Sequence, residues 1–322
     1  SRLGANALLA VSLAFARAVA AQHGLPLYRH LAQAAGAVPA ALPRPFINLF
    51  SGGLHAGGQI ELQDVMIVPA RARTMDEALA VAFEVYRAAA AHTQAAYGAR
   101  LLRADEGGLA PPFPGIRAML ADAVTAIGAA GLTPGTDVAL AIDVAASHFT
   151  EGPGRYQLAG EVLDAAAMVS EISGWQRDYP IISVEDGLAE DDWQGWPLLA
   201  AGLRGRSLVI GDDLLCTSPE RIRRAAALGA ADTLLLKPNQ AGTVTEAAAA
   251  GEAARTAGWR VMASARSGET EDAWLADLAV AWSADYIKIG SITQSDRLAK
   301  YNRLLAIGAE TGWPLTDMPL RP

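Results

Sequence analysis

Cysteine is almost missing from this chain of 322 residues, because Cys216 is the only one. A single thiol rules out a disulfide within the chain, which fits a reducing cytoplasm, and we expect a cytoplasmic protein. Aromatic residues are also sparse, at 6% of the chain. The core is therefore expected to consist mainly of small aliphatic side chains.

Positive charge is not concentrated in any segment. The net charge is -8, and acidic and basic residues are interspersed. Without a polybasic run or an aromatic–basic stripe, nucleic acid is not an expected partner. The longest apolar stretch, residues 4–21, contains Asn6, Ser12 and Arg17. A bilayer span would rarely tolerate that mixture, so we expect no membrane span there, but a largely buried helix of a soluble protein.

No Gly-x-Gly-x-x-Gly motif follows the first strand candidate, so a dinucleotide-binding fold has no support. Instead, short apolar runs rich in β-branched residues alternate with longer stretches of helical spacing. The predicted strands are 46–50, 65–68, 138–144, 181–184, 208–210, 233–236, 261–263 and 286–289. The predicted helices are 75–97, 115–130, 163–176, 218–228, 242–257, 270–282 and 296–307. This alternation indicates the α/β class, and eight strands favour a closed barrel over an open sheet.

Charged residues stand at or near the ends of the later strand candidates. They are Asp143, Glu185, Asp212, Lys237, Arg266 and Lys288. In a barrel, consecutive strand ends meet at one rim, so we expect these charges to share one pocket. A lone Asp after a strand is more often a helix cap or turn residue. Six charged residues at barrel spacing favour a functional site instead.

The residue types in this series point to a particular chemistry. Three carboxylates at successive strand ends supply the oxygen ligands that Mg²⁺ prefers. The two lysines and the arginine would serve a small anionic substrate. A lysine held near other cations can lose its proton near neutral pH, which makes Lys237 the candidate general base.

Longer motifs resemble those of the enolase family, and they are more specific than any single short pattern. They include Gly-Ala-Asn-Ala-Leu-Leu-Ala-Val-Ser-Leu-Ala at 4–14, Leu-Pro-Leu-Tyr at 25–28, Gly-Gly-Leu-His-Ala-Gly-Gly at 52–58, Asp-Glu-Gly-Gly-Leu-Ala-Pro at 105–111, Lys-Pro-Asn-Gln-Ala-Gly-Thr at 237–243, Arg-Ser-Gly-Glu-Thr-Glu-Asp at 266–272 and Asp-Arg-Leu-Ala-Lys-Tyr-Asn at 296–302. The motifs cover nearly the whole chain in family order.

The resemblance implies a division of the chain into two parts. Residues 41–322 would form an enolase-type eight-stranded (β/α) barrel with an irregular opening topology. Residues 1–40 would be the C-terminal part of an N-terminal α+β capping domain, most of which would precede Ser1. The last helix of that domain, near 4–22, would then expose an apolar face. The resemblance also implies a homodimer.

The resemblance further implies a magnesium-dependent lyase. Such an enzyme takes the α-proton from 2-phosphoglycerate and eliminates water to give phosphoenolpyruvate. The resemblance implies that Asp143, Glu185 and Asp212 bind Mg²⁺, that Lys237 is the general base, and that Glu106 assists the leaving hydroxide. Asp64 takes the place of a second catalytic glutamate. The implied substrate-binding residues are His55, Gln63, Lys288, Arg266 and Ser267; Lys288 binds the carboxylate, and Arg266 and Ser267 bind the phosphate.

Three positions depart from the family pattern. Asp64 stands where the family has Glu, Ala265 stands where it has His, and Ser51 stands where Asn usually precedes two glycines. Asp64 is one methylene shorter than Glu, and a shift of about 1 Å can cost two orders of magnitude in rate.

These departures leave three functions open. The first is an ordinary enolase, which the unaltered metal and lysine set slightly favours. The second is a paralogue such as carboxyphosphonoenolpyruvate synthase of phosphonate biosynthesis, with another leaving group or second substrate. The third is a catalytically impaired binding or scaffold protein.

Overall fold

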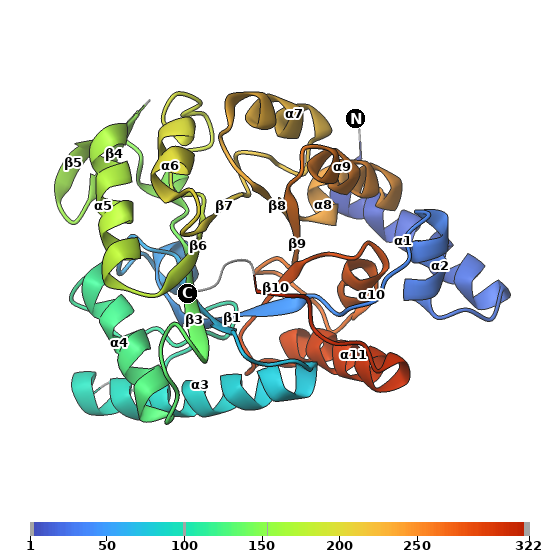
Figure 1. Ribbon diagram of the computed structural model, residues 1–322, viewed down its shortest axis with the longest axis horizontal. Coiled ribbons are helices and arrows are strands. Elements are labelled where there is room, and N and C mark those ends of the chain that lie inside the picture. Colours follow the sequence, from blue (N-terminus) through green and yellow to red (C-terminus); the bar gives the residue numbers. More distant parts are fainter. Residues whose placement is uncertain (1–2, 99–100, 153, 319–322) are drawn as a thin grey trace.

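The computed structural model describes residues 3–98, 101–152 and 154–318, and these form a closed barrel of eight strands surrounded by helices (Figure 1). The order around the barrel is β1 (Arg44–Ser51), β10 (Tyr286–Gly290), β9 (Arg260–Ser264), β8 (Thr233–Leu236), β7 (Leu208–Gly211), β6 (Ile181–Glu185), β3 (Val138–Asp143) and β2 (Asp64–Pro69). All eight predicted strands are confirmed, as is the closed α/β barrel.

The opening of the barrel is irregular, as the family resemblance implies. Strand β2 is antiparallel to both of its neighbours, β1 and β3, whereas the other neighbouring pairs are parallel. Ser51, the last residue of β1, therefore pairs with Asp64, the first residue of β2. The connection between them, residues 52–63, consequently lies at the same rim as the carboxyl ends of the parallel strands.

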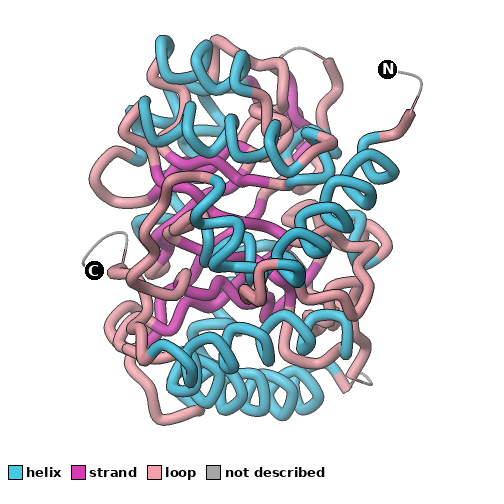
Figure 2. Tube along the Cα trace, turned by 90° about the vertical axis from the view of Figure 1, so that its right-hand side faces the viewer, coloured by secondary structure: helices cyan, strands magenta, loops and turns pink. Residues whose placement is uncertain are grey.

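Helices cover the outside of the barrel, with strands enclosed by helices in both views (Figures 1 and 2). They are α3 (Met75–Tyr97), α4 (Ile116–Ala129), α5 (Ala165–Asp178), α6 (Trp196–Leu203), α7 (Pro219–Leu228), α8 (Pro238–Ala241), α9 (Val244–Thr256), α10 (Trp274–Ala281) and α11 (Ser295–Thr311). The seven predicted helices are present, although α10 begins four residues later than expected. The short helices α6 and α8 and the hairpin of β4 (Arg155–Leu158) and β5 (Glu161–Asp164) were not predicted.

The core has two layers. A large apolar cluster fills the space between strands and helices. A second cluster fills the inside of the barrel, and it consists of Phe46, Met66, Val68, Ala139, Ala141, Ile182, Leu208, Ile210, Leu235, Met262 and Tyr286. The barrel is therefore a packed core below its mouth rather than a pore, as is usual for this architecture.

Two helices, α1 (Ala5–Gln22) and α2 (Leu27–Ala34), precede the barrel; α1 contacts α8 and α9, and α2 contacts α10. The expectation that the first helix is largely buried is wrong, since only 22% of α1 is buried. Val11 and Phe15 are 72% and 71% exposed, which agrees with the apolar face implied by the resemblance. Among the described residues, α1 alone has the length and apolarity of a membrane span, a combination that helices of soluble proteins also show.

Gly290, at the end of β10, is a position where any side chain is expected to destabilise the barrel. Its φ is 112°, and a Cβ atom would lie 2.9 Å from both the carbonyl oxygen of Glu106 and Cδ of Arg297. We expect Gly290→Ala to lower the free energy of unfolding by about 1–3 kcal/mol and to lower the thermal unfolding midpoint. The matched control is Gly128→Ala in α4, where nothing lies within 4 Å of the added Cβ. It should be neutral or stabilising, and equal midpoints for the two variants would contradict this account.

Candidate active site

The mouth of the barrel contains a cavity of about 310 Å³, at the small end of the range for ligand pockets. Nine of the predicted site residues line it: His55, Gln63, Glu106, Asp143, Asp212, Lys237, Arg266, Ser267 and Lys288. The other two, Asp64 and Glu185, are buried directly behind it, where they contact His55 and Lys288. The structure thus brings all of these residues together, while their individual roles remain predictions.

Strand geometry explains how these side chains reach the cavity. Side chains alternate between the two faces of a strand, so a residue two positions after an interior core residue also points inward. Leu235, Ile210 and Tyr286 belong to the interior core. Two residues after them in the sequence come Lys237, Asp212 and Lys288, respectively. The inward face of each of these chain segments therefore changes from apolar to charged at the carboxyl end of its strand.

Strands β2 and β6 require separate explanations. Because β2 runs in the opposite direction, Asp64 comes two residues before Met66 instead of after it. On β6, Glu185 comes three residues after Ile182, because the pairing of β6 with β3 shifts register. After that shift Asp143 pairs with Glu185, so their two carboxylates meet at the same level.

Buried carboxylates and lysines are tightly paired on one side of the mouth. Nζ of Lys288 lies 2.7 Å from Oδ2 of Asp143 and 2.8 Å from each carboxylate oxygen of Glu185. Nζ of Lys237 donates to Oδ2 of Asp212. Burial, followed by repulsion from Asp143, raises the pKa of Glu185 well above its ordinary value. Negative charge is therefore in excess on this side.

The three predicted metal ligands fit a hard divalent cation by their chemistry. They are carboxylates on successive barrel strands, and two of them pair across β3 and β6. An all-oxygen donor set of this kind suits Mg²⁺. Asp212 also lies within 4.8 Å of carboxylate oxygens of Asp186 and Asp213.

Asp186 supports the candidate site, and the sequence argument did not single it out. It is buried with a φ of 40°, and its carboxylate accepts the backbone N–H groups of Asp212 at 2.9 Å and of Asp213 at 2.8 Å. It thereby fixes the turn that carries Asp212. The Glu185-Asp186 dipeptide directly after a strand was the available signal, but Asp186 faces the next turn rather than the cavity.

The expectation that neighbouring cations lower the pKa of Lys237 is wrong for the side chains as they stand. Burial lowers this pKa, but the carboxylates of Asp212 and Glu185 outweigh burial, and the pKa is raised above its ordinary value. Lys288, a cation, opposes this only in part. A neutral Lys237 therefore requires that positive charge elsewhere compensate Asp212.

Beside Asp143, which pairs with Asp64 across β3 and β2, the mouth carries a histidine and two acids. A ring nitrogen of His55 and one carboxylate oxygen each of Asp64 and Glu106 all lie within 4.8 Å of one another. Nδ2 of Asn48 on β1 donates to Oε2 of Glu106 at 3.1 Å, a contact that the sequence argument did not anticipate. Burial, then the charge of Asp64, raises the pKa of Glu106. In the strand order, β2 and β8 are four places apart in a ring of eight, so Asp64 lies across the barrel from Lys237.

Arg266 and Ser267 lie on the loop after β9. The fully buried Arg297 on α11 donates to their carbonyl oxygens at 2.7 and 2.6 Å, and to that of Ile289 at 3.0 Å. Nη1 of Arg266 donates to Oδ1 of Asn239 at 3.0 Å. Arg297 thus holds the predicted phosphate-binding loop against the end of β10, which the motif alone did not indicate.

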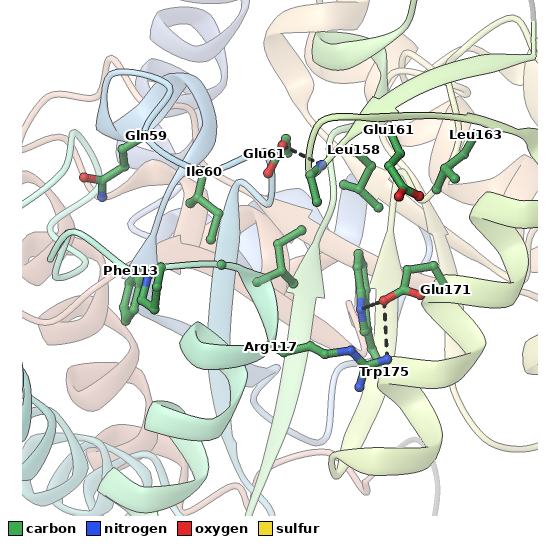
Figure 3. Close-up of a pocket in the computed structure, with 14 residues that line it drawn as sticks. Gln59, Ile60, Glu61, Phe113, Arg117, Leu158, Glu161, Leu163, Glu171 and Trp175 are labelled. Atoms are coloured by element: carbon green, nitrogen blue, oxygen red, sulfur yellow. Dashed lines mark hydrogen bonds and ion pairs between the residues drawn. The ribbon is translucent and has the colours of Figure 1, made fainter.

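The structure also has a larger cavity, of about 610 Å³, outside the barrel mouth (Figure 3). It lies between α4, α5, the β4–β5 hairpin and residues 59–61. Its polar groups are largely engaged with each other: Glu171 accepts from Trp175 at 2.7 Å and from Arg117 at 3.3 Å, and Glu61 accepts from Ala159 at 2.9 Å. None of the predicted site residues lines it. Size therefore does not identify the reaction centre here, whereas side-chain chemistry does.

Comparison with known families agrees with this geometry. The family profile for the enolase C-terminal TIM barrel domain matches residues 39–314. The matched segment contains all eight barrel strands and the helices from α3 to α11. It also contains every residue of the cavity described above.

The carboxylate set makes a prediction about metal binding. We expect Mg²⁺ to raise the thermal unfolding midpoint, because a ligand at 100 times its Kd stabilises the folded state by about 2.7 kcal/mol. Glu185→Gln should abolish that magnesium-induced shift. Glu161→Gln, which changes an exposed carboxylate of the larger cavity, is the matched control and should retain it. An undiminished shift in Glu185→Gln would remove Glu185 from the ligand set.

Proposed function

This chain belongs to the enolase family, and on that premise we propose that it is a magnesium-dependent lyase acting on 2-phosphoglycerate. It removes the α-proton and eliminates water to give phosphoenolpyruvate. The observation that carries the proposal is the division of one small cavity into two sides. Lys237 and the carboxylates of Asp143 and Asp212 line one part, with Glu185 buried behind them, and Glu106, a buried acid with a raised pKa, lines another.

Lys237 is the base in this proposal. Its neutral amine takes the proton from the carbon next to the substrate carboxylate, and the electron pair moves into that carboxylate. Lys288 donates a hydrogen bond to the same carboxylate. Bound Mg²⁺, held by Asp143, Glu185 and Asp212, would supply positive charge beside these oxygens.

Glu106 is the acid. Burial and the charge of Asp64 raise the pKa of its carboxyl. In the proposed step, the proton of this carboxyl passes to the hydroxyl on the β-carbon as the C–O bond breaks. Water leaves, the electron pair from the α-carbon forms the new double bond, and Glu106 remains as a carboxylate. Asn48 supports this step because its amide holds one carboxyl oxygen of Glu106 in place.

The remaining polar groups suit a phosphorylated carboxylate. Arg266 and Ser267 supply donors for the phosphate on the outer part of the cavity. Gln63 lines the cavity, and its buried Oε1 has no hydrogen-bond partner among the described residues, which supports Gln63 as a substrate-binding residue. We further propose a homodimer in the cytoplasm, as in the family; the exposed thiol of Cys216 is compatible with a reducing compartment.

Ala265 favours a second candidate function. It lines the cavity where the family has an imidazole, so the cavity gains space and loses one hydrogen-bond donor at that point. Such a change suits a different leaving group or a second substrate, as in carboxyphosphonoenolpyruvate synthase.

The base and acid assignments predict different losses. In deuterated water with Mg²⁺, Lys237→Ala should reduce exchange of the substrate α-proton at least about a hundredfold, because general bases contribute about 10²–10⁴ in rate. Glu106→Gln should retain exchange and lose elimination by a similar factor. NMR of the substrate follows exchange, and phosphoenolpyruvate formation follows elimination. Exchange that survives Lys237→Ala would refute the base assignment.

The second candidate makes its own prediction. The full-length protein would then convert 2-phosphoglycerate slowly when alone, and a phosphonoformate donor would raise consumption of substrate at least about tenfold. The measurement is substrate consumption and product identity with and without the donor. Efficient phosphoenolpyruvate formation without any donor would eliminate this candidate, and turnover in neither case would favour a scaffold role.

A further inference from the structure

Two of the three departures from the family pattern are in direct contact. Ser51 and Asp64 are cross-strand partners at the ends of β1 and β2 that meet at the mouth. Oγ of Ser51 donates to Oδ1 of Asp64 at 2.6 Å. Both side chains are fully buried, and neither lines the cavity. Ser51 and Asp64 therefore form one physical unit, and Asp64 has no surface with which to touch a substrate.

The other oxygen of Asp64 is directed at His55. Oδ2 lies 3.0 Å from Nδ1 of the imidazole. An ionised carboxylate only accepts hydrogen bonds, so Nδ1 must carry the proton that joins them. Burial lowers the pKa of His55, but the hydrogen bond and the charge of Asp64 outweigh burial, and this pKa is raised above its ordinary value. Only the neutral ring keeps a lone pair on Nε2. Unlike Asp64, His55 lines the cavity, so its imidazole is the part of this array that a substrate can meet.

We propose that Asp64 is a positioning residue that acts through His55, with Ser51 holding its second oxygen. This inference rests on the proposed lyase function and deepens it. The substrate hydroxyl that leaves donates its hydrogen to Nε2 of His55. That contact turns an oxygen lone pair towards the protonated Glu106, whose atoms lie within 4.8 Å of His55 and Asp64. The proton that completes water still comes from Glu106, so His55 transfers none.

The shorter carboxylate is thus matched to its surroundings rather than being a weakened glutamate. A glutamate at position 64 would carry one more methylene into a fully buried space that Ser51 already limits at 2.6 Å. Overpacking of that kind displaces side chains and destabilises the fold. The family's glutamate cannot simply be restored here, because the serine is part of the same array.

The first test reads the imidazole directly. Nitrogen NMR of the full-length protein labelled at histidine, at a pH above the raised pKa of His55 where its ring is neutral, reports which ring nitrogen carries the proton. We expect Nδ1–H for His55. An Nε2–H tautomer would overturn the proposal, and this result does not depend on any activity.

The second test separates the two chemical steps. Asp64→Asn keeps the shape of the side chain but can present an N–H to Nδ1, which favours the other tautomer. We expect elimination to fall by about 10²–10⁴ in kcat, with KM and α-proton exchange nearly unchanged. Unchanged elimination, or an equal loss of exchange and elimination, would refute the assignment.

A matched control exists on the outside of the barrel. Nε2 of His92 lies 2.8 Å from Oδ1 of Asp122, between α3 and α4, and neither residue lines the cavity. Asp122→Asn should leave both rates unchanged.

Asp64→Glu is the discriminating variant: we expect a lower unfolding midpoint and slower elimination than wild type. Faster elimination would mean that Asp64 acts as a catalytic carboxylate itself. If the wild type exchanged no α-proton at all, the proposed function would fail. The tautomer measured by NMR would still decide whether Asp64 orients His55.

Discussion

Burial of negative charge at the mouth of the barrel is the constraint that the rest of the site has to satisfy. Parallel pairing places the ends of the neighbouring strands β3, β6 and β7 side by side, and the carboxylates there are shielded from water. Isolated buried charges are costly, so each must find a partner. Lys288 lies between two of the carboxylates and Lys237 pairs with the third. The position of the proposed base follows from this balance, and so does the suitability of these carboxylates for the proposed metal ion.

The inward-facing alternation explains why much of the site could be predicted from the sequence. Lys237 and Lys288 follow apolar strand residues at the spacing that keeps them on the inner face, so a charge there is visible as an interruption of an apolar run. Strand positions were predicted well for the same reason. The irregular opening of the barrel was implied by the family resemblance, but the reversed direction of β2 was not predicted, because the apolar pattern is the same for either direction.

The unpredicted parts lack such a local signal. Strand β5 is almost wholly exposed and has no apolar alternation, so the predicted helix 163–176 included its last two residues. Helix α6 is short and strongly apolar, which periodicity does not distinguish from a loop or strand. Contacts such as Ser51 with Asp64 depend on the register between two strands, and register is a property of the folded sheet. The sequence comparison could therefore flag both residues as unusual, but it could not reveal that they touch.

The antiparallel course of β2 has one further consequence. Most rim segments of this barrel lead from a strand into a helix, so a change in their length alters how that helix seats on the sheet. Residues 52–63 instead start and finish on two strands that are bonded to each other. The segment therefore forms an arch, and the hydrogen bonds between β1 and β2 hold its two ends together. Insertions, deletions or exchanges within this arch can reshape one wall of the reaction chamber while the helical shell stays as it is, which makes it a natural place for new substrate preferences to arise.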